Sequence, residues 1–322
     1  MPARKIAPPP AHIYPPEPWR ITECRFSPDH VDRAETFFSL ANGYLGVRGT
    51  FEESRPGWSA GTFVNGFHET WPIIHAEDAF GLARTGQTIV NVPDATILKL
   101  YVDDEPLFLP VARMPEYERS LDMRDGTLTR KLLWSTPSGK HVRVTSQRLI
   151  SLESRHVLAT TYEVTLLDHG APVVISSQVV NHQDAGANTA NHDSLDPRLA
   201  KVFTDRVLNP VVVDHHDNRF SLGYRTTHSE MTLGLGVDHM IETDNDHEVA
   251  VSATGDLSKL VLTADAQPGV PIKITKYASY HTSRSVPVPE LIDRAGRSLD
   301  RMLRIGFDGL VSQQRDHLDR FW

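Results

Sequence analysis

Short runs of alternating apolar and polar residues, separated by tight-turn residues, constrain the fold of this 322-residue chain more than any other feature. The alternation is clearest in residues 140–145, 161–166 and 272–276. A period of two places one set of side chains on the buried face of a β-strand and the other set on the opposite face. Asn42-Gly43 lies between the apolar runs 37–40 and 44–47, and this dipeptide favours a hairpin because both residues tolerate positive φ. The sequence therefore predicts an all-β, antiparallel fold with on the order of fourteen to sixteen short strands.

The two ends of the chain differ from this pattern. Residues 1–18 hold seven prolines and predict an extended arm, because proline fixes φ and lacks a backbone donor. Residues 19–286 form the predicted β-domain, and residues 287–322 carry two amphipathic stripes that predict two helices. The second stripe ends on Phe321 and Trp322, two large aromatic residues. We therefore expect the helices to be linkers that dock onto a further domain, and the chain to be part of a longer protein.

Composition excludes several classes of protein. The formal net charge of −8 argues against a nucleic-acid surface, which is normally basic. No apolar stretch approaches the roughly 18 residues of a membrane span, so no membrane partner is expected. A single cysteine, Cys24, and the lack of an Asn-x-Ser/Thr sequon favour a reducing compartment, and we predict a cytoplasmic protein.

Two long stretches, His68–Gln87 and Asn181–Asn209, have weak patterning and predict loops, which at this length are often functional. Two polar clusters, 181–184 and 191–193, lie in the second stretch, and His215-His216 follows it. Turn-forming Asn and Asp explain the clusters better than calcium, and adjacent strand residues such as the two histidines face opposite ways. No metal site is therefore predicted, and no cofactor.

Two further motifs have the composition of a catalytic site but not its context. Gly57–Gly61 fits the Gly-x-Ser-x-Gly nucleophile elbow, but a strand-like run follows it where that motif requires a helix. Glu52-Glu53 is a carboxylate doublet, and glycoside hydrolysis uses two carboxyl groups. Adjacent strand residues point apart, so the doublet predicts a poor catalytic pair. Two structural interpretations of the doublet remain open. Either one of its acids is buried and paired with Arg48, or the doublet lies on a solvated edge.

The segment Glu35–Glu53 resembles the amino-terminal signature of family 65 glycoside hydrolases, which include maltose, trehalose and kojibiose phosphorylases and some trehalose hydrolases. Four further segments resemble family motifs in the family's order: Gly61–Phe67, Tyr117–Arg130, Arg148–Ser151 and Lys276–Tyr280. Within the signature, the residues expected to be structurally demanding are Asn42, Gly43, Gly46, Arg48, Gly49 and Glu53.

The resemblance implies a two-sheet β-supersandwich of the galactose mutarotase-like type, followed by linker helices and an (α/α)6 catalytic barrel that this chain lacks. The general acid and the phosphate-binding residues of the family lie in that barrel, so no catalytic residue is assigned here. The implied role is an accessory domain that supports the barrel, dimer contacts and the active-site mouth. Its implied partners are the barrel, a second copy in a homodimer and a disaccharide, with inorganic phosphate as co-substrate if the enzyme is a phosphorylase.

Three residues are candidates for the active-site mouth: His68, Glu69 and Trp71. Aromatic faces stack on sugar rings and carboxylates accept hydroxyl hydrogen bonds, although a core or interface position explains Trp71 equally well. Two other functions remain open from the residues alone. One is a self-contained aldose epimerase, which needs a His acid and a Glu base; the other is a stand-alone carbohydrate-binding module.

Overall fold

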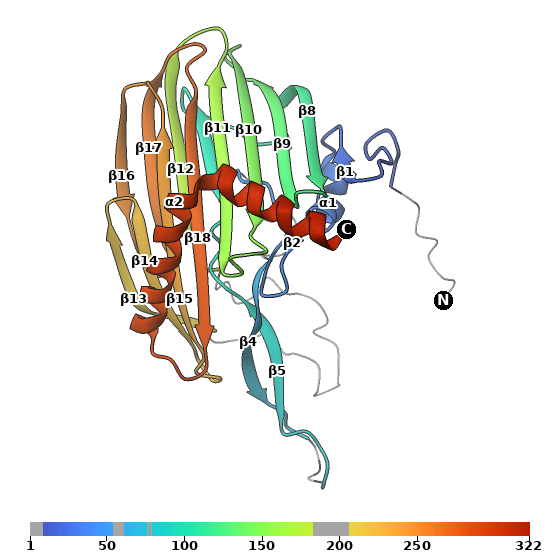
Figure 1. The fold of residues 1–322 in the computed structure, drawn as a ribbon, viewed down its shortest axis with the longest axis vertical. Coiled ribbons are helices and arrows are strands. Elements are labelled where there is room, and N and C mark those ends of the chain that lie inside the picture. The colour runs from blue at the N-terminus through green and yellow to red at the C-terminus, as the bar shows by residue number, and fades with distance from the viewer. Residues whose placement is uncertain (1–8, 54–60, 76, 78, 183–205) are drawn as a thin grey trace.

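The computed structural model describes residues 9–53, 61–75, 77, 79–182 and 206–322. The fold is dominated by antiparallel β-sheet, as predicted, and Figure 1 shows it as layers of long strands with one long helix on the outside. The described residues contain three sheets instead of the two predicted. The additional sheet is small and includes the hairpin at Asn42-Gly43.

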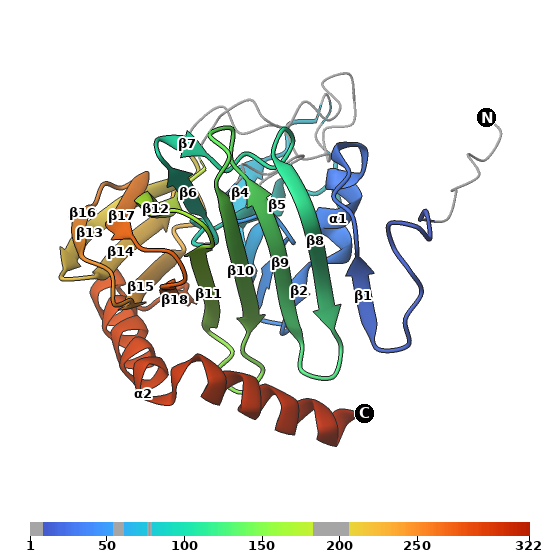
Figure 2. The same ribbon diagram turned by 90° about the horizontal axis from the view of Figure 1, so that it is seen from above.

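The largest sheet has nine strands in the order β1-β8-β9-β10-β11-β18-β15-β14-β13. It curves strongly from one edge to the other, as Figure 2 shows. Its strands are β1 (Arg20–Glu23), β8 (Arg113–Asp122), β9 (Thr127–Ser135), β10 (His141–Ile150), β11 (Val157–Leu166), β13 (Leu208–His216), β14 (Arg219–Thr226), β15 (Thr232–Glu242) and β18 (Ile272–Ser283).

The second sheet has five strands in the order β16-β17-β12-β6-β7. Its strands are β6 (Leu98–Val102), β7 (Glu105–Pro106), β12 (Ala171–Val180), β16 (His247–Ser252) and β17 (Leu257–Ala266). One continuous apolar core joins it to the large sheet. Val142 and Val144 of β10 alternate with polar residues and are fully buried in this core, as their period of two predicts. Each such side chain contributes roughly 1.5–3 kcal/mol on burial.

The third sheet has the order β2-β3-β4-β5 and consists of β2 (Leu40–Ala41), β3 (Leu45–Val47), β4 (Thr62–Pro72) and β5 (Thr85–Asn91). The predicted turn lies between β2 and β3, with Gly43 at a φ of 85°. The apolar run before it was expected to be extended, but residues up to Phe37 are helical: η1 (Pro28–His30) leads into α1 (Val31–Phe37). The helix buries Ala34 against the core, so packing of one helical face overrides the strand preference of the two phenylalanines.

The long helix α2 (Val288–Phe321) covers the outer face of β14, β15 and β18 (Figures 1 and 2). Glycines make this close approach possible. A Cβ atom at Gly234 would lie 2.5 Å from the backbone of Leu291, and one at Gly236 would lie 2.7 Å from Leu299 Cδ1. The alternation of glycine with inward-facing leucine in β15 therefore serves two layers at once.

The two helical stripes predicted for 287–322 form one helical run that bends at Gly306, whose backbone is non-helical (φ 73°, ψ 168°). Beyond the bend, the indole N–H of Trp322 donates to the Met123 carbonyl at 2.9 Å, and its ring lies 5.4 Å from that of Trp19. The rings of Phe321 and Trp322 remain largely exposed. Within the described residues, no helix has the length and apolar character that crossing a membrane requires.

Candidate functional site

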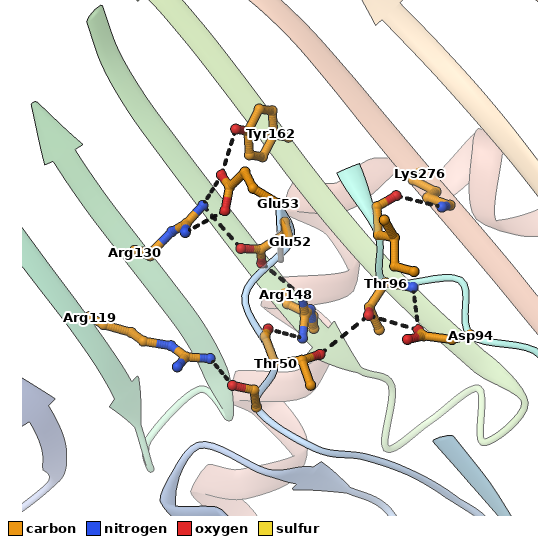
Figure 3. A network of polar contacts seen from close by, with 12 residues as sticks. Thr50, Glu52, Glu53, Asp94, Thr96, Arg119, Arg130, Arg148, Tyr162 and Lys276 are labelled. Carbon is orange, nitrogen blue, oxygen red and sulfur yellow. Dashed lines mark hydrogen bonds and ion pairs between the residues drawn. The ribbon is translucent and has the colours of Figure 1, made fainter. Parts of the chain in front are cut away.

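A row of basic side chains crosses the inner face of the nine-stranded sheet (Figure 3). Arg119, Arg130 and Arg148 project from the adjacent strands β8, β9 and β10, and each is almost completely buried. Arg119 and Arg130 are direct cross-strand neighbours. Like charges at opposed positions destabilise a sheet, so this row requires anionic partners.

The segment Thr50–Glu53 supplies those partners from between the sheets. Both Arg130 terminal nitrogens donate to the Glu53 carboxylate, at 2.7 and 2.5 Å, and Arg130 also lies 3.1 Å from Glu52. Arg148 donates to Glu52 at 2.8 Å and to the Thr50 carbonyl at 3.2 Å. The hydroxyl of Tyr162, from β11, donates to Glu53 at 2.6 Å. Each carboxylate therefore accepts charge-assisted bonds, which are the strong class of hydrogen bond.

Electrostatics fixes the protonation of this network. Burial opposes ionisation of Glu52, but Arg130 and Arg148 outweigh it and hold the pKa of the carboxyl below its ordinary value. Burial, and then the charge of Glu53, raises the pKa of the Tyr162 hydroxyl far above its usual range. Tyr162 is therefore a permanent donor, and the charges of the carboxylates and guanidiniums compensate each other.

This geometry corrects the interpretation of the Glu52-Glu53 doublet. The two side chains were expected to point apart on a strand, with either one acid buried against Arg48 or a solvated edge. Instead, both lie in a turn and converge on Arg130. Arg48 instead pairs with the buried Glu35 at 3.2 Å. Because both carboxylates are saturated by arginine and tyrosine, they cannot also serve as an acid and a base on a sugar.

A smaller polar group continues the network toward the centre of the large sheet. Thr96 donates to Asp94 through its backbone and its hydroxyl, at 2.8 and 2.7 Å, and its hydroxyl lies 3.5 Å from that of Thr50. Lys276 of β18 donates to the Gln178 carbonyl at 2.7 Å. Burial lowers the pKa of Lys276 to about 7.

The signature residues 42–49 organise the start of this network. The Asn42 side-chain nitrogen donates to the carbonyls of Ser151 and Arg155, at 2.7 and 2.9 Å, and its oxygen accepts from two backbone amides of its own turn. Gly49 lets the chain pass close to Phe38, where an added Cβ would come within 2.6 Å. Arg119 donates to the Gly49 carbonyl at 2.5 Å. Asn42 and Gly49 thus have structural roles, whereas an added Cβ at Gly46 would make only ordinary contacts.

The stretch predicted as a loop from His68 to Gln87 is mainly a β-hairpin, because β4 and β5 pair from His68↔Ile89 to Pro72↔Thr85. Figure 1 shows this hairpin projecting from the body of the domain. The three mouth candidates therefore lie on a strand. Glu69 and Trp71 are two positions apart and so lie on the same face of the strand. This period-two signal was difficult to recognise in the sequence because the stretch has a weak apolar pattern.

Glu69 is completely buried and fixes the base of the hairpin. Its carboxylate accepts from the backbone amides of Thr70, His228 and Ser229, at 2.8, 3.0 and 2.7 Å, and the Ser229 hydroxyl donates to the His68 carbonyl at 2.6 Å. Three of these hydrogen bonds, from His228 and Ser229, therefore tie β4 to the turn between β14 and β15. The carboxylate that was a sugar-binding candidate is committed to backbone donors.

His68 and Trp71 are also oriented by local contacts. The Trp71 ring is buried over its cross-strand partner Gly86, where an added Cβ would lie 2.4 Å from the indole. His68 Nδ1 lies 2.9 Å from the Gly66 carbonyl, and its side chain is half-buried. Of the three candidates, only His68 thus remains partly open to a ligand.

Among the described residues, the remaining sequence motifs form no further candidate site. The Gly57–Gly61 motif lies largely outside the described residues, as do residues 183–184 and the cluster 191–193. His215 and His216 are both exposed on β13. Among the described residues, no group of three or more His, Cys, Asp or Glu side chains could hold a metal ion.

Comparisons with known proteins give a consistent family. The profile described as "Glycosyl hydrolase family 65, N-terminal domain" matches residues 21–321. An uncharacterized glycosyl hydrolase of Mycobacterium tuberculosis is 34% identical over 309 residues, which are 96% of this chain and 38% of the relative. An α,α-trehalose phosphorylase of Thermoanaerobacter brockii is 33% identical over 315 residues, 96% of this chain and 40% of that enzyme. The chain thus spans less than half the length of these relatives.

A solved structure supports the fold. A putative kojibiose phosphorylase from the human microbiome superposes with a TM-score of 0.81 over 96% of this chain and 38% of that one. Its sequence identity is 20%, so the likeness concerns the fold alone.

Proposed function

This chain belongs to the family of N-terminal domains of family 65 glycosyl hydrolases, and from that membership we propose that it is a non-catalytic domain supporting a catalytic barrel in a disaccharide phosphorylase or hydrolase. The observation that carries the proposal is the saturation of the inner face of the large sheet. Arg130 and Arg148 there bind the chain's own Glu52 and Glu53. The acids on the inner face of this sandwich are already bound by its own arginines. This arrangement suits a supporting role better than a catalytic one.

The candidate partners follow the same reasoning. The relatives that match over 96% of this chain have about three-fifths of their length outside the matched region, which is room for a separate catalytic barrel. A disaccharide is the proposed substrate of the whole protein, with inorganic phosphate as co-substrate if it is a phosphorylase. We also propose that the whole protein is a homodimer and is cytoplasmic.

We propose that the β4–β5 hairpin is the element that reaches the active-site mouth. Its base is fixed by Glu69, and its far part carries Ile74, Phe80 and Leu82 as exposed apolar side chains. Exposed apolar residues grouped on a projecting element are typical of a contact surface. His68 is the mouth candidate that stays available for a sugar hydroxyl.

The proposal is tested by activity with and without a catalytic region. The purified chain is incubated with trehalose, kojibiose and maltose, with and without phosphate, and release of glucose or of a sugar phosphate is measured. We expect no turnover. In parallel, the chain replaces the matching region of the T. brockii trehalose phosphorylase, and we expect measurable phosphorolysis from this chimera. Turnover by the chain alone would contradict a supporting role.

Carbohydrate binding is a second candidate, favoured by the partly exposed pair Trp19 and Trp322, whose rings meet edge to face. Asp122 and Trp322 border a neighbouring groove of about 220 Å³, so polar and aromatic groups lie together. Calorimetry with the three disaccharides distinguishes the two functions. Saturable binding that Trp19→Ala abolishes would favour a binding module.

A further inference from the structure

A cluster of five cationic or titratable side chains lies where the signature turn meets helix α2. We call Arg155, His156, His281, Arg294 and Arg297 the cationic cluster. Arg155 and His156 come from the turn before β11, His281 from the end of β18, and the last two from the first turns of α2. The imidazole rings of His156 and His281 are stacked, with centroids 4.0 Å apart.

The cluster is held in place by contacts that begin at the signature residues. Asn42 binds the carbonyls of Ser151 and Arg155 and so fixes the turn. Tyr44, two residues later, packs edge to face on His156 with centroids 4.5 Å apart, and its ring lies 5.3 Å from the Arg155 guanidinium carbon. The fold therefore defines the position of the turn, so its members of the cluster, Arg155 and His156, are preorganised for a ligand.

Hydrogen bonds determine the tautomers of both histidines. His156 Nδ1 lies 2.9 Å from the Tyr280 carbonyl and must donate, while its Nε2 accepts from Arg155 Nε at 3.3 Å. Ser298 donates its hydroxyl to the Arg294 carbonyl, so His281 Nε2 is the donor to Ser298 at 3.2 Å. The His156 ring, with one nitrogen donating and the other accepting, is therefore neutral in this arrangement.

The positive charge of the cluster is incompletely balanced. Glu290 lies 3.0 Å from Arg294 and 3.8 Å from Arg297, and it is the one carboxylate among the described residues that forms an ion pair with the cluster. Arg294 and Arg297 thus share one carboxylate, whereas Arg155 forms no ion pair with a described carboxylate and uses only Nε in its bond to His156. Guanidinium groups with free terminal nitrogens bind oxyanions through paired hydrogen bonds.

We propose that the cationic cluster binds a small oxyanion of the phosphate class. Arg155 contacts the anion from the turn, Arg294 and Arg297 contact it from α2, and the stacked histidines form the floor of the site. The inference goes beyond the proposed function and does not depend on it, because the anion binds to this chain's own residues whether or not a catalytic barrel is present.

Linkage between the anion and the histidines provides a specific readout. Burial, His156 and the arginines Arg294, Arg155 and Arg297 lower the pKa of His281 to about 3. Burial and Arg155 also lower the pKa of His156. The groups that face His281 are thus His156 and Arg155 from the turn and the two arginines of α2, with Glu290 beyond them and the Tyr44 hydroxyl across the turn. A bound anion offsets the arginine charges, so both histidine pKa values should rise.

The experiment follows the histidine ring signals of the chain by NMR while inorganic phosphate is added. Sodium chloride of equal ionic strength is the reference, and His156→Asn and His281→Asn assign the two signals. We expect saturable shifts of both signals with phosphate, and an upward displacement of their titration curves. A hexose phosphate, as a second probe, distinguishes free phosphate from a phosphorylated sugar as the source of the anion.

Arginine variants locate the site. Arg155→Gln and Arg297→Gln each remove one guanidinium from the exposed rim, and we expect at least tenfold weaker phosphate binding from either. Arg143→Gln, an exposed position on β10, is the matched control and should bind as the parent does. Circular dichroism verifies that all variants are folded. Equal shifts with chloride and phosphate, or shifts unchanged in Arg155→Gln, would overturn the proposal.

Discussion

The interior between the two large sheets and the projecting β4–β5 hairpin use charge in opposite ways. In the interior, two arginines, two glutamates and a tyrosine bind one another through ion pairs and hydrogen bonds, and all are buried. In the hairpin, a single carboxylate, Glu69, fixes the base, and the part beyond Pro72 exposes apolar side chains. Residues that make the fold are thus separated from residues that are free to meet a partner. The comparison assigns large stability effects to the interior and to the buried base of the hairpin, and small ones to the exposed far part of the hairpin.

Arg130→Met should have the largest effect, because it leaves Glu52 and Glu53 buried without their shared guanidinium. Breaking one side of a buried ion pair costs about 3–5 kcal/mol. Urea unfolding measures the change. Arg143→Met, on the exposed face of β10, is the matched control, for which we expect less than about 0.5 kcal/mol. Equal losses in the two variants would show that the interior network does not stabilise the fold more than a surface charge does.

Glu69→Gln should have the next largest effect and should act locally. The neutral amide keeps the shape but weakens the bonds from the amides of Thr70, His228 and Ser229, and hydrogen bonds to a charged group contribute about 1.5–3 kcal/mol together with their desolvation. Amide hydrogen exchange should rise in β4 and β5 before it rises in the large sheet. Glu77→Gln, at an exposed position of the same hairpin, is the control. Uniform exchange across all strands would contradict a local role.

The third effect concerns pH and again belongs to the interior. His239 of β15 is buried between Ser177 and the Asn218 carbonyl, and burial, then Lys276, lowers its pKa from 6.5 to about 3. The unfolded chain therefore binds a proton below about pH 6.5 that the folded chain refuses until about pH 3. The free energy of unfolding should fall as pH falls through this window, by about 1.4 kcal/mol per pH unit from this group.

His239→Asn tests that assignment, since it removes the titrating group and retains a donor and an acceptor. Between pH 6 and 4, the slope of the free energy of unfolding against pH should decrease by about 1.4 kcal/mol per pH unit, which corresponds to one proton. Urea unfolding at several pH values measures this slope. His216→Asn, at a highly exposed position on β13, should leave the slope unchanged. An unaltered slope in His239→Asn would mean that other groups cause the acid sensitivity.

The same division explains what the sequence could predict. Period-two patterning located β10, β11 and β18 well, because the signal lies within a few residues of each strand. The partners of Glu52 and Glu53 could not be located in this way. Arg130 and Arg148 lie 77 and 96 positions along the chain from the glutamates they bind, and only the folded sheet brings them together. The available signal was an arginine at an inward-facing strand position, which a pattern of apolar residues does not reveal.

The hairpin was missed for the opposite reason. Its base is buried through Glu69, a charged residue, and its tip exposes Ile74 and Phe80, so polarity and burial are inverted relative to an ordinary strand. Such inversion is typical of a segment whose composition serves contact with another surface. The predicted loop at 68–87 was therefore wrong in secondary structure, although it marked the segment that we propose as functional.

Phe80→Ser combined with Ile74→Ser should have the smallest effect on stability and so gives the sharpest separation of the two regions. Both side chains are exposed in the described structure, so the free energy of unfolding of the isolated chain should change by less than about 0.5 kcal/mol. In the chimera with the T. brockii catalytic region, the same change should lower phosphorolysis about ten- to a hundredfold if the tip helps to position the mouth. Leu152→Ser, a partly exposed apolar position in a turn far along the chain from the hairpin, is the control for general surface polarity. A chimera that retains full activity with the altered tip would show that the hairpin projects without contacting the catalytic region, and its apolar tip would then require a different partner.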